Sequence, residues 1–396
     1  MGSLFSGLIV SKVRIKLLTR AFFNAMIQTQ QISMACRRAI LLLVAIGIIW
    51  AIVPMASATR DMCPSMMSYL RLARPHTFCD EPAPMDDPEV RERFEREFLL
   101  SAWNEPQVIL WLKRSKRYFN IVEPMLHSAG LPDDLKYVAV AESALRPHAG
   151  SRKGAMGFWQ FMPATGRKYG LTIDSRKDER RNIFRSTRAA ITYFKELREQ
   201  FGSWTLAAAA YNMGEQGLMS EILEQRTDNY YDLYLPLETQ DFLFRILAIK
   251  LIMTHPERFG FELTPGDYYP PLTFDRVRID CTVETPIRLV AQAAGTQFKV
   301  IKDLNPEIRG YFLAQGTHEI LVPKGASAEF QKRFAKLGKQ SASGQDSRIY
   351  IVRKGDTLSS IAARFDVPLP AIIIWNRLDP KRPIHPGDKL TIHPGK

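Results

Sequence analysis

The first 60 residues of this 396-residue chain contain no aspartate and no glutamate, although they contain several lysines and arginines. Six of the 13 net positive charges lie before residue 59, so the rest of the chain carries a modest excess of seven. Such an excess suits an acidic polymer, but a solvated surface produces it just as readily, so it identifies no partner. No basic stripe or known motif predicts a nucleic-acid interface.

The acid-free segment has the order of features that is typical of export. An apolar run at 39–53 follows Arg37-Arg38 and precedes a small-x-small triplet at 56–58. We therefore expect residues 1–58 to be a signal peptide or an N-terminal membrane anchor. Met34 would begin a signal of ordinary length, and the apolar run approaches the roughly 20 residues of a spanning helix, so cleavage stays open. The protein is predicted to be exported to the periplasm or cell envelope, with the inner membrane as a partner if the segment is uncleaved.

Cysteine is scarce, with four residues, and their spacing matches no metal site. Cys36 precedes the apolar run, so it is not a lipid-attachment cysteine that follows one. Cys63 and Cys79 lie just after the export segment, where a disulfide would be stable, and they are either bridged or both free. Cys281 is left unpaired if they are bridged. No metal and no organic cofactor is predicted.

The exported part divides by composition and periodicity. Residues 59–94 are rich in Pro, Met and Cys at their start and are predicted to be an irregular lead-in. Residues 95–262 have apolar residues at three- and four-residue spacing, which predicts a mainly helical domain. A Pro- and Tyr-rich stretch at 266–271 marks its end.

An internal repeat follows. Residues 287–323, moved forward by 71 positions, fall on 358–394 without a gap and align Asn305 with Asn376. Each copy has the pattern of a strand, two helices and a second strand. The predicted segments are a degenerate module at 272–325, a linker at 326–346 and a second module at 347–396.

The second copy carries the sharper pattern. It reads Ile-Val-Arg-Lys-Gly-Asp-Thr-Leu at 351–358, followed by Trp375-Asn376, and it resembles the LysM family. The resemblance implies a βααβ fold that binds N-acetylglucosamine-containing glycans such as peptidoglycan. Val283-Glu284-Thr285-Pro286 replaces the Gly-Asp-Thr turn in the first copy, whose glycan binding therefore stays open. The candidate glycan-binding residues, which alternatively only determine the fold, are Gly355, Asp356, Thr357, Leu358 and Asn376.

One glutamate in the helical domain stands out. A helix predicted to open at Pro132-Asp133 has an apolar face that includes Leu135 and Val138, and Glu142 continues that face. Partial desolvation and the negative end of the helix dipole both favour the protonated carboxyl. Cleavage of a glycosidic bond requires such an acid, because the leaving oxygen must be protonated. The alternative is a surface glutamate at a frayed helix end.

The surroundings of Glu142 in the sequence favour the catalytic interpretation. No acidic residue occurs from 143 to 173, where small, aromatic and amide residues gather instead. Small residues let a backbone approach a ligand closely, and Gln160 offers an amide for sugar hydroxyl or acetamido groups. An Ala-Ala-Ala-Tyr-Asn run at 208–212 ends a later helix. This order of motifs resembles the soluble-lytic-transglycosylase family.

The resemblance implies a lysozyme-like catalytic domain of the α+β class, mainly helical, in which Glu142 is the only catalytic carboxylate. Phe242 departs from the family, which usually has a tyrosine there whose hydroxyl helps to hold the glutamate. Either another group such as Tyr211 orients Glu142, or its acidity differs. For Phe158, Trp159 and Phe161, core packing is as good an interpretation as a groove role. The implied substrate-binding residues are Ser143, Ser151, Gly157, Gln160, Met162, Ala210, Tyr211 and Asn212.

A single acid implies the reaction of a lytic transglycosylase. Glu142 would cleave the β-1,4 bond between N-acetylmuramic acid and N-acetylglucosamine without water and leave a 1,6-anhydromuramoyl end. One alternative is a goose-type lysozyme-like hydrolase of peptidoglycan, with Asp174 or Glu215 as a second carboxylate. Another is a non-catalytic LysM scaffold that only binds the cell wall.

Overall fold

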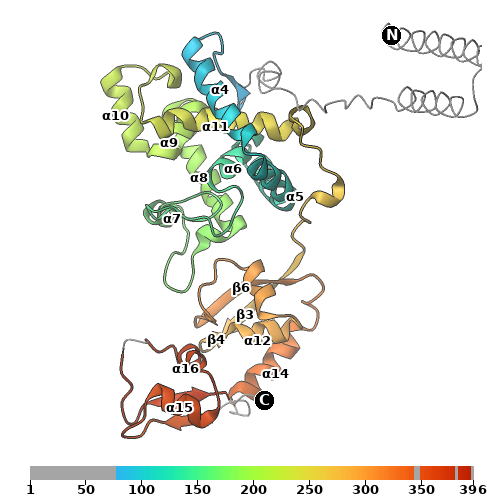
Figure 1. Cartoon of the computed structure of the whole chain (residues 1–396), viewed down its shortest axis with the longest axis vertical. Coiled ribbons are helices and arrows are strands. Elements are labelled where there is room, and N and C mark those ends of the chain that lie inside the picture. Colours follow the sequence, from blue (N-terminus) through green and yellow to red (C-terminus); the bar gives the residue numbers. More distant parts are fainter. Residues whose placement is uncertain (1–76, 343–347, 380–381, 394–396) are drawn as a thin grey trace, which may run out of the picture. The chain divides into compact units, whose positions relative to one another are not determined.

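The computed structural model describes residues 77–342, 348–379 and 382–393 (Figure 1). The predictions for residues 1–58 and for Cys63 fall outside these ranges, so the Cys63–Cys79 bridge stays a prediction; Cys79 is buried. Within the described ranges, no single helix combines the length and apolarity of a membrane span, although one bent helix pair near the C-terminus meets both criteria jointly.

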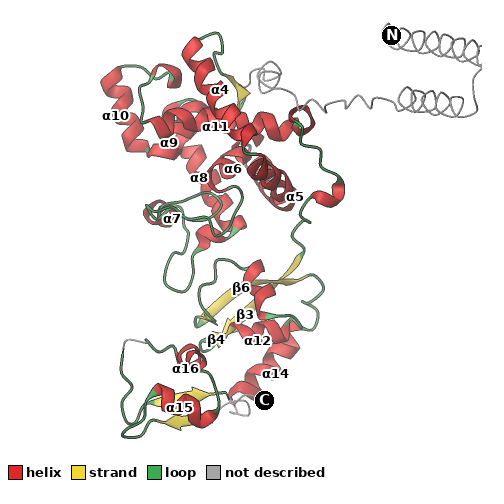
Figure 2. Cartoon of the chain, in the orientation of Figure 1, coloured by secondary structure: helices red, strands yellow, loops and turns green. Residues whose placement is uncertain are grey.

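The first part of the described chain is a helical domain, as predicted (Figure 2). Its central helix, α11, is apolar around most of its circumference and is buried on nearly all sides, which is expected of a helix inside a core. Helices α4, α6 and α9 pack against it. The helices are α4 (Pro88–Trp103), α5 (Glu105–Ser128), α6 (Lys136–Ser143), α7 (Pro163–Lys168), α8 (Ile183–Phe201), α9 (Trp204–Met213), α10 (Glu215–Gln225) and α11 (Leu237–Thr254).

The predicted lead-in at 59–94 is corrected over its described part. Strands β1 (Thr77–Phe78) and β2 (Glu81–Pro82) form a small antiparallel hairpin before α4 begins at Pro88. Phe78 is fully buried in the core of the helical domain. The Glu81 carboxylate accepts hydrogen bonds from the first two backbone N–H groups of α9, where a negative charge is favoured. The hairpin is therefore part of the domain.

Helix α6 ends abruptly, and this end positions the predicted catalytic glutamate. A 3-10 turn (Asp133–Leu135) leads into the helix. Ala144 and Leu145 then adopt left-handed backbone conformations, with φ of 51° and 56°. A left-handed residue is the usual way to stop a helix. Glu142 consequently lies in the last turn of α6.

The repeat predicted from the sequence is present as two βααβ modules (Figures 1 and 2). In each module the outer strands pair antiparallel, and each module has a hydrophobic core of its own. A second short pair, β4 (Thr285–Pro286) with β5 (Phe312–Leu313), adds to the first module. The first module contains β3 (Phe274–Cys281), α12 (Ile287–Ala293), α13 (Phe298–Leu304) and β6 (Gly316–Pro323); the second contains β7 (Arg348–Ile351), α15 (Leu358–Phe365), α16 (Leu369–Asn376) and β8 (Lys389–Ile392).

The predicted linker at 326–346 is also corrected. Residues Phe330–Ala342 form helix α14, which packs on α12 of the first module. Phe330 is fully buried, and Phe334 and Leu337 are packed against the same core. Their spacing of four and three residues is that of an amphipathic helix, which the Ser-, Gly- and Lys-rich composition of the segment concealed.

Candidate active site

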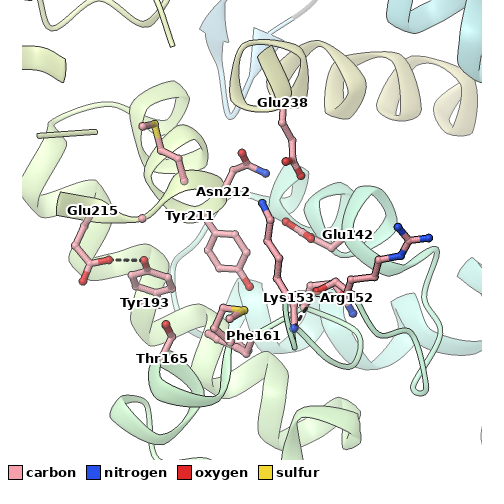
Figure 3. A pocket seen from close by; sticks show the side chains of 16 residues that line it. Glu142, Arg152, Lys153, Phe161, Thr165, Tyr193, Tyr211, Asn212, Glu215 and Glu238 are labelled. Carbon is pink, nitrogen blue, oxygen red and sulfur yellow. Dashed lines mark hydrogen bonds between the residues drawn. The ribbon is translucent and has the colours of Figure 1, made fainter. Parts of the chain in front are cut away.

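Glu142 opens into a cavity of about 540 Å³ in the helical domain (Figure 3). The walls come from the ends of α6 and α9, the loop at 151–162, helices α7 and α8, and the first turns of α10 and α11. Five of the predicted substrate-binding residues lie in these walls together with Glu142. They are Ser151, Gln160, Met162, Tyr211 and Asn212.

The environment of Glu142 keeps its carboxyl protonated. Burial raises its pKa to about 8, the charge of Glu238 raises it as well, and Arg245 acts in the opposite direction. The Glu142 side chain forms no hydrogen bond or ion pair with any residue of the described ranges. At neutral pH this group is therefore a carboxylic acid that faces an open cavity, which is the state a general acid needs.

Tyr211 lies beside Glu142 but is bound elsewhere. Its hydroxyl donates a 2.7 Å hydrogen bond to the backbone carbonyl of Trp159, and its ring stacks on Phe194 at 4.6 Å. Burial, and secondly the charge of Glu142, raise the pKa of the Tyr211 hydroxyl well above its ordinary value. The phenol therefore stays neutral. The structure shows no hydrogen bond through which Tyr211 would orient Glu142.

Asn212 presents one end of its amide to the cavity (Figure 3). Its Oδ1 accepts a 2.8 Å hydrogen bond from the Thr239 hydroxyl, which fixes the orientation of the group. The Asn212 NH2 group is left to donate to a ligand, and a sugar hydroxyl or acetamido oxygen is a suitable acceptor. Phe242 is buried in α11, one turn beyond Glu238, which lines the cavity.

The loop that follows α6 is shaped by Gly157. Its φ of 84° is left-handed, and a Cβ built on it would lie 1.9 Å from the carbonyl oxygen of Arg180. Only glycine fits there. Gln160 adds to the loop, because its Nε2 donates to the carbonyls of Ala149 and Gly157 at 3.0 and 2.8 Å. Gly157 therefore shapes the loop from behind and does not line the cavity.

Ser143 and Ala210 also support the site from behind. The Ser143 side chain is buried, and its hydroxyl lies 3.0 Å from the Ala139 carbonyl and 2.7 Å from the Phe158 carbonyl. Ala210 is fully buried in α9. Phe158, Trp159 and Phe161 are buried too, so the core-packing interpretation holds for most of each ring, although Phe161 reaches the cavity wall.

Sequence reasoning missed a buried ion pair behind the loop. Arg180 binds both carboxylate oxygens of Asp178 at 2.8 Å. The same guanidinium donates to the carbonyls of Gly154 and Phe161, at 2.8 and 3.0 Å, and so fastens both ends of the loop. In the sequence these two residues belong to an Asp-Glu-Arg-Arg run, which is typical of a solvated surface.

Of the two carboxylates proposed for a hydrolase, only Glu215 lines the cavity. It accepts a 2.7 Å hydrogen bond from the Tyr193 hydroxyl (Figure 3) and lies 3.3 Å from Lys168. The hydrogen bond from Tyr193 lowers the pKa of Glu215, so this group is ionised at neutral pH. Asp174 instead accepts backbone hydrogen bonds in its own turn.

The LysM candidates all have roles inside their module. Asp356 accepts from the Tyr350 hydroxyl and the Arg353 N–H, and Thr357 forms a capping box with Ser360 at the start of α15. Gly355 has a left-handed φ of 90°, and Leu358 packs against the core. The Asn376 amide donates to two backbone carbonyls and accepts one N–H. These contacts fit the alternative in which such residues determine the fold.

Two domain families match the chain. Residues 120–233 match the transglycosylase SLT domain, and residues 350–393 match the LysM domain. The chain contains a transglycosylase SLT domain. The C-terminal βααβ module is a LysM domain, as predicted.

Curated relatives extend this similarity beyond the SLT domain. Membrane-bound lytic murein transglycosylase D of Escherichia coli strain K12 is 34% identical over 296 residues, which are 71% of this chain and 64% of that protein. The protein of the same name from E. coli O6:H1 gives the same values. The chain thus spans less than two thirds of the length of these relatives. Among solved structures, the 70 kDa soluble lytic transglycosylase SLT70 from E. coli is 15% identical, with a TM-score of 0.32 over 51% of this chain and 42% of that chain.

Within the described ranges, no group of three or more His, Cys, Asp and Glu side chains is arranged to hold a metal ion.

Proposed function

We propose that the SLT domain is a peptidoglycan lytic transglycosylase that uses Glu142 as its single general acid and base. The observation that carries the proposal is a carboxyl group with a pKa raised to about 8, facing a cavity of about 540 Å³. A general acid works best when its pKa lies near the operating pH. The SLT match and the similarity to named murein transglycosylases support the same activity.

The reaction begins with proton transfer from Glu142 to the oxygen that joins N-acetylmuramic acid to N-acetylglucosamine. The bond from the muramoyl C1 to this oxygen breaks, and the N-acetylglucosamine leaves with a 4-hydroxyl. The substrate's own acetamido oxygen stabilises the positive charge at C1, so no second carboxylate is required. The ionised Glu142 then removes the proton of the muramoyl C6 hydroxyl, whose oxygen bonds to C1. Glu142 ends protonated, and the product is a 1,6-anhydromuramoyl end.

The remaining lining groups bind the sugar. The NH2 group of Asn212 is free to donate a hydrogen bond to a sugar oxygen, since the Thr239 hydroxyl already binds the Oδ1 of the same amide. Met162, with 42% of its surface exposed, offers an apolar contact for a sugar ring. Ser151 and Gln160 line the same cavity. Subsite residues of this kind position the bond to be cut against the acid.

Export and wall attachment complete the proposal. Residues 1–58 direct the chain to the periplasm, as a cleaved signal or as an anchor in the inner membrane. The LysM module holds the catalytic domain on its glycan substrate, which raises the local concentration of cleavable bonds. The partner is peptidoglycan, and no nucleic acid is involved.

The test is digestion of purified peptidoglycan by residues 59–396, with the released ends identified by mass spectrometry. We expect anhydromuramoyl ends from the wild type and a loss of roughly 10²–10⁴ in rate for Glu142→Gln, the range of general acid catalysis. Glu215→Gln should still give anhydromuramoyl ends, because no step uses that carboxylate.

Other results would support the alternatives. Free reducing ends, lost in Glu215→Gln, would identify a lysozyme-type hydrolase. The non-catalytic scaffold would be favoured if the wild type and Glu142→Gln both sedimented with the wall and neither released any fragment.

A further inference from the structure

Two positively charged residues stand at the cavity beside the catalytic acid. Arg152 and Lys153 are consecutive, exposed and among the residues that line the cavity with Glu142 (Figure 3). Neither side chain forms a hydrogen bond or an ion pair with any part of the chain that the structure describes. Most other cations near the site are engaged: Lys168 contacts Glu215, and Arg180 pairs with Asp178.

The turn that carries these two cations is held in place. The Ser151 N–H donates to the Ala155 carbonyl at 3.0 Å, and the Ser151 hydroxyl accepts from the Ala155 N–H at 3.0 Å. The Gly154 carbonyl accepts from the buried Arg180 guanidinium at 2.8 Å. Arg152 and Lys153 therefore project from a turn whose two ends are fixed, which reduces the ordering that binding would require.

The catalytic acid does not account for these charges. Arg245 is the cation that acts on Glu142, whereas neither residue of the turn contributes to its acidity. No ion pair joins Arg152 or Lys153 to Glu238 or Glu215, the other carboxylates in the lining. The two cations are thus available to a ligand, and the chemistry of the substrate indicates which part of it they would meet.

The two sugars of a stem-bearing strand carry no charge, because the lactyl carboxyl of the muramoyl residue is amide-bonded to the stem, so binding these sugars needs no cation. The muramoyl residue, however, bears a short peptide on its lactyl group, and that peptide contains free carboxylates. Arginine and lysine on a glycan-binding cavity are suited to such carboxylates, through charge-assisted hydrogen bonds. We propose that Arg152 and Lys153 bind carboxylates of the peptide stem and make the enzyme selective for stem-bearing strands. This inference rests on the proposed function.

The experiment compares two soluble substrates, glycan strands with intact uncrosslinked stems and the same strands stripped of peptide by an amidase. Amidase cleavage frees a lactyl carboxylate on each muramoyl residue, so that group is then capped as a neutral methylamide. The readout is the ratio of the rates at which anhydromuramoyl ends form from the two. The test variant is Arg152→Gln/Lys153→Gln. The control is Arg188→Gln/Lys195→Gln, which removes the same charge from exposed positions of α8 that do not line the cavity. Arg152→Lys/Lys153→Arg keeps the charge and serves as the rescue.

We expect the test variant to lower the ratio roughly 3- to 20-fold, as two exposed ion pairs would. The control and the charge-conserving swap should keep the wild-type ratio. Raising the salt concentration should lower the ratio of the wild type and leave that of the test variant little changed, since exposed charges are screened. An unchanged ratio in the test variant, or an equal loss on both substrates, overturns the inference. If the wild type released no anhydromuramoyl ends from either substrate, that result would instead contradict the proposed function.

Discussion

Asn305 and Asn376 occupy equivalent places in the two βααβ modules and make the same three hydrogen bonds. Each side-chain amide donates to the carbonyl four residues earlier in its own helix. It also donates to a carbonyl of the closing strand and accepts the N–H of the same strand residue, which is Leu321 in one module and Thr391 in the other. The asparagine thus joins the second helix to the last strand, and this role explains why it recurs at the same place in the repeat.

The first prediction follows from the three hydrogen bonds of Asn305. Asn305 is fully buried, so Asn305→Ala leaves the backbone N–H and carbonyl of Leu321 without partners. Lost hydrogen bonds at a buried site should lower the free energy of unfolding of the first module by about 2–3 kcal/mol. Urea unfolding measures the change. Gln292→Ala, at an exposed position of α12, is the control and should have little effect; equal effects of the two would refute the structural role of Asn305.

Gly157 provides the second prediction. In Gly157→Ala the new methyl group would collide with the Arg180 carbonyl, 1.9 Å away, and the residue would also keep a left-handed φ. Gly154→Ala has the same kind of backbone strain, with a φ of 97°, but nothing lies within 4 Å of its Cβ. We therefore expect Gly154→Ala to cost about 1–2 kcal/mol and Gly157→Ala considerably more, with loss of cleavage. Thermal unfolding and the peptidoglycan digest check both, and similar melting temperatures would show that the backbone yields at Gly157.

The Asp178–Arg180 pair provides the third prediction. Both side chains are buried, and Arg180 also binds the two carbonyls that end the active-site loop. Arg180→Met should lower the free energy of unfolding by about 3–5 kcal/mol, because it leaves the buried Asp178 carboxylate with Arg181, 3.8 Å away, in place of its bidentate partner. Asp178→Asn in the same chain should recover part of that loss, since it removes a buried charge that Arg181 alone compensates poorly. A double-mutant cycle in urea measures the coupling, and strictly additive effects would contradict it.

The sequence was informative wherever a local pattern carried the signal. Glu142 could be predicted because it continues an apolar helix face and is followed by an acid-free run of small and amide residues. The two modules could be predicted because Asn305 and Asn376 align at a fixed offset together with glycine and proline. Such features depend on neighbours in the chain or on an exact repeat, and neither requires knowledge of distant contacts.

The rest could not be predicted because it depends on contacts between distant segments. The hairpin around Phe78 belongs to the core through helices far along the chain, while its own composition is typical of an irregular segment. Arg180 is part of a charged run and becomes buried only because the active-site loop folds over it. Ser143 and Gly157 were predicted to contact substrate, and the contacts that the structure shows for them, which support the loop, come from segments that the sequence pattern does not connect.

The last prediction concerns the dependence of stability on pH. The Glu142 carboxyl has an ordinary pKa of 4.5 and a folded-state pKa of about 8. Between these values the unfolded chain has lost the proton and the folded chain has kept it, so stability falls as pH rises through this window. Glu142→Gln removes the titrating group and should gain stability relative to the wild type across the same window. Each tenfold difference in acidity between the folded and unfolded states corresponds to about 1.4 kcal/mol, so the gain is at most about 4–5 kcal/mol.

Glu215→Gln supplies a control of opposite sign. The folded-state pKa of Glu215 is lowered by the Tyr193 hydroxyl, so its carboxylate contributes stability above its ordinary pKa, and that stability is lost as pH falls through the folded value. We therefore expect Glu215→Gln to melt below the wild type at pH 8, where Glu142→Gln should melt above it, and both differences to shrink toward pH 4. The cleavage rate of the wild type should fall above pH 8, because the acid form of Glu142 disappears there. If the stability gain of Glu142→Gln did not change between pH 4 and pH 8, Glu142 would titrate normally, and its protonated state at neutral pH, on which the mechanism depends, would be wrong.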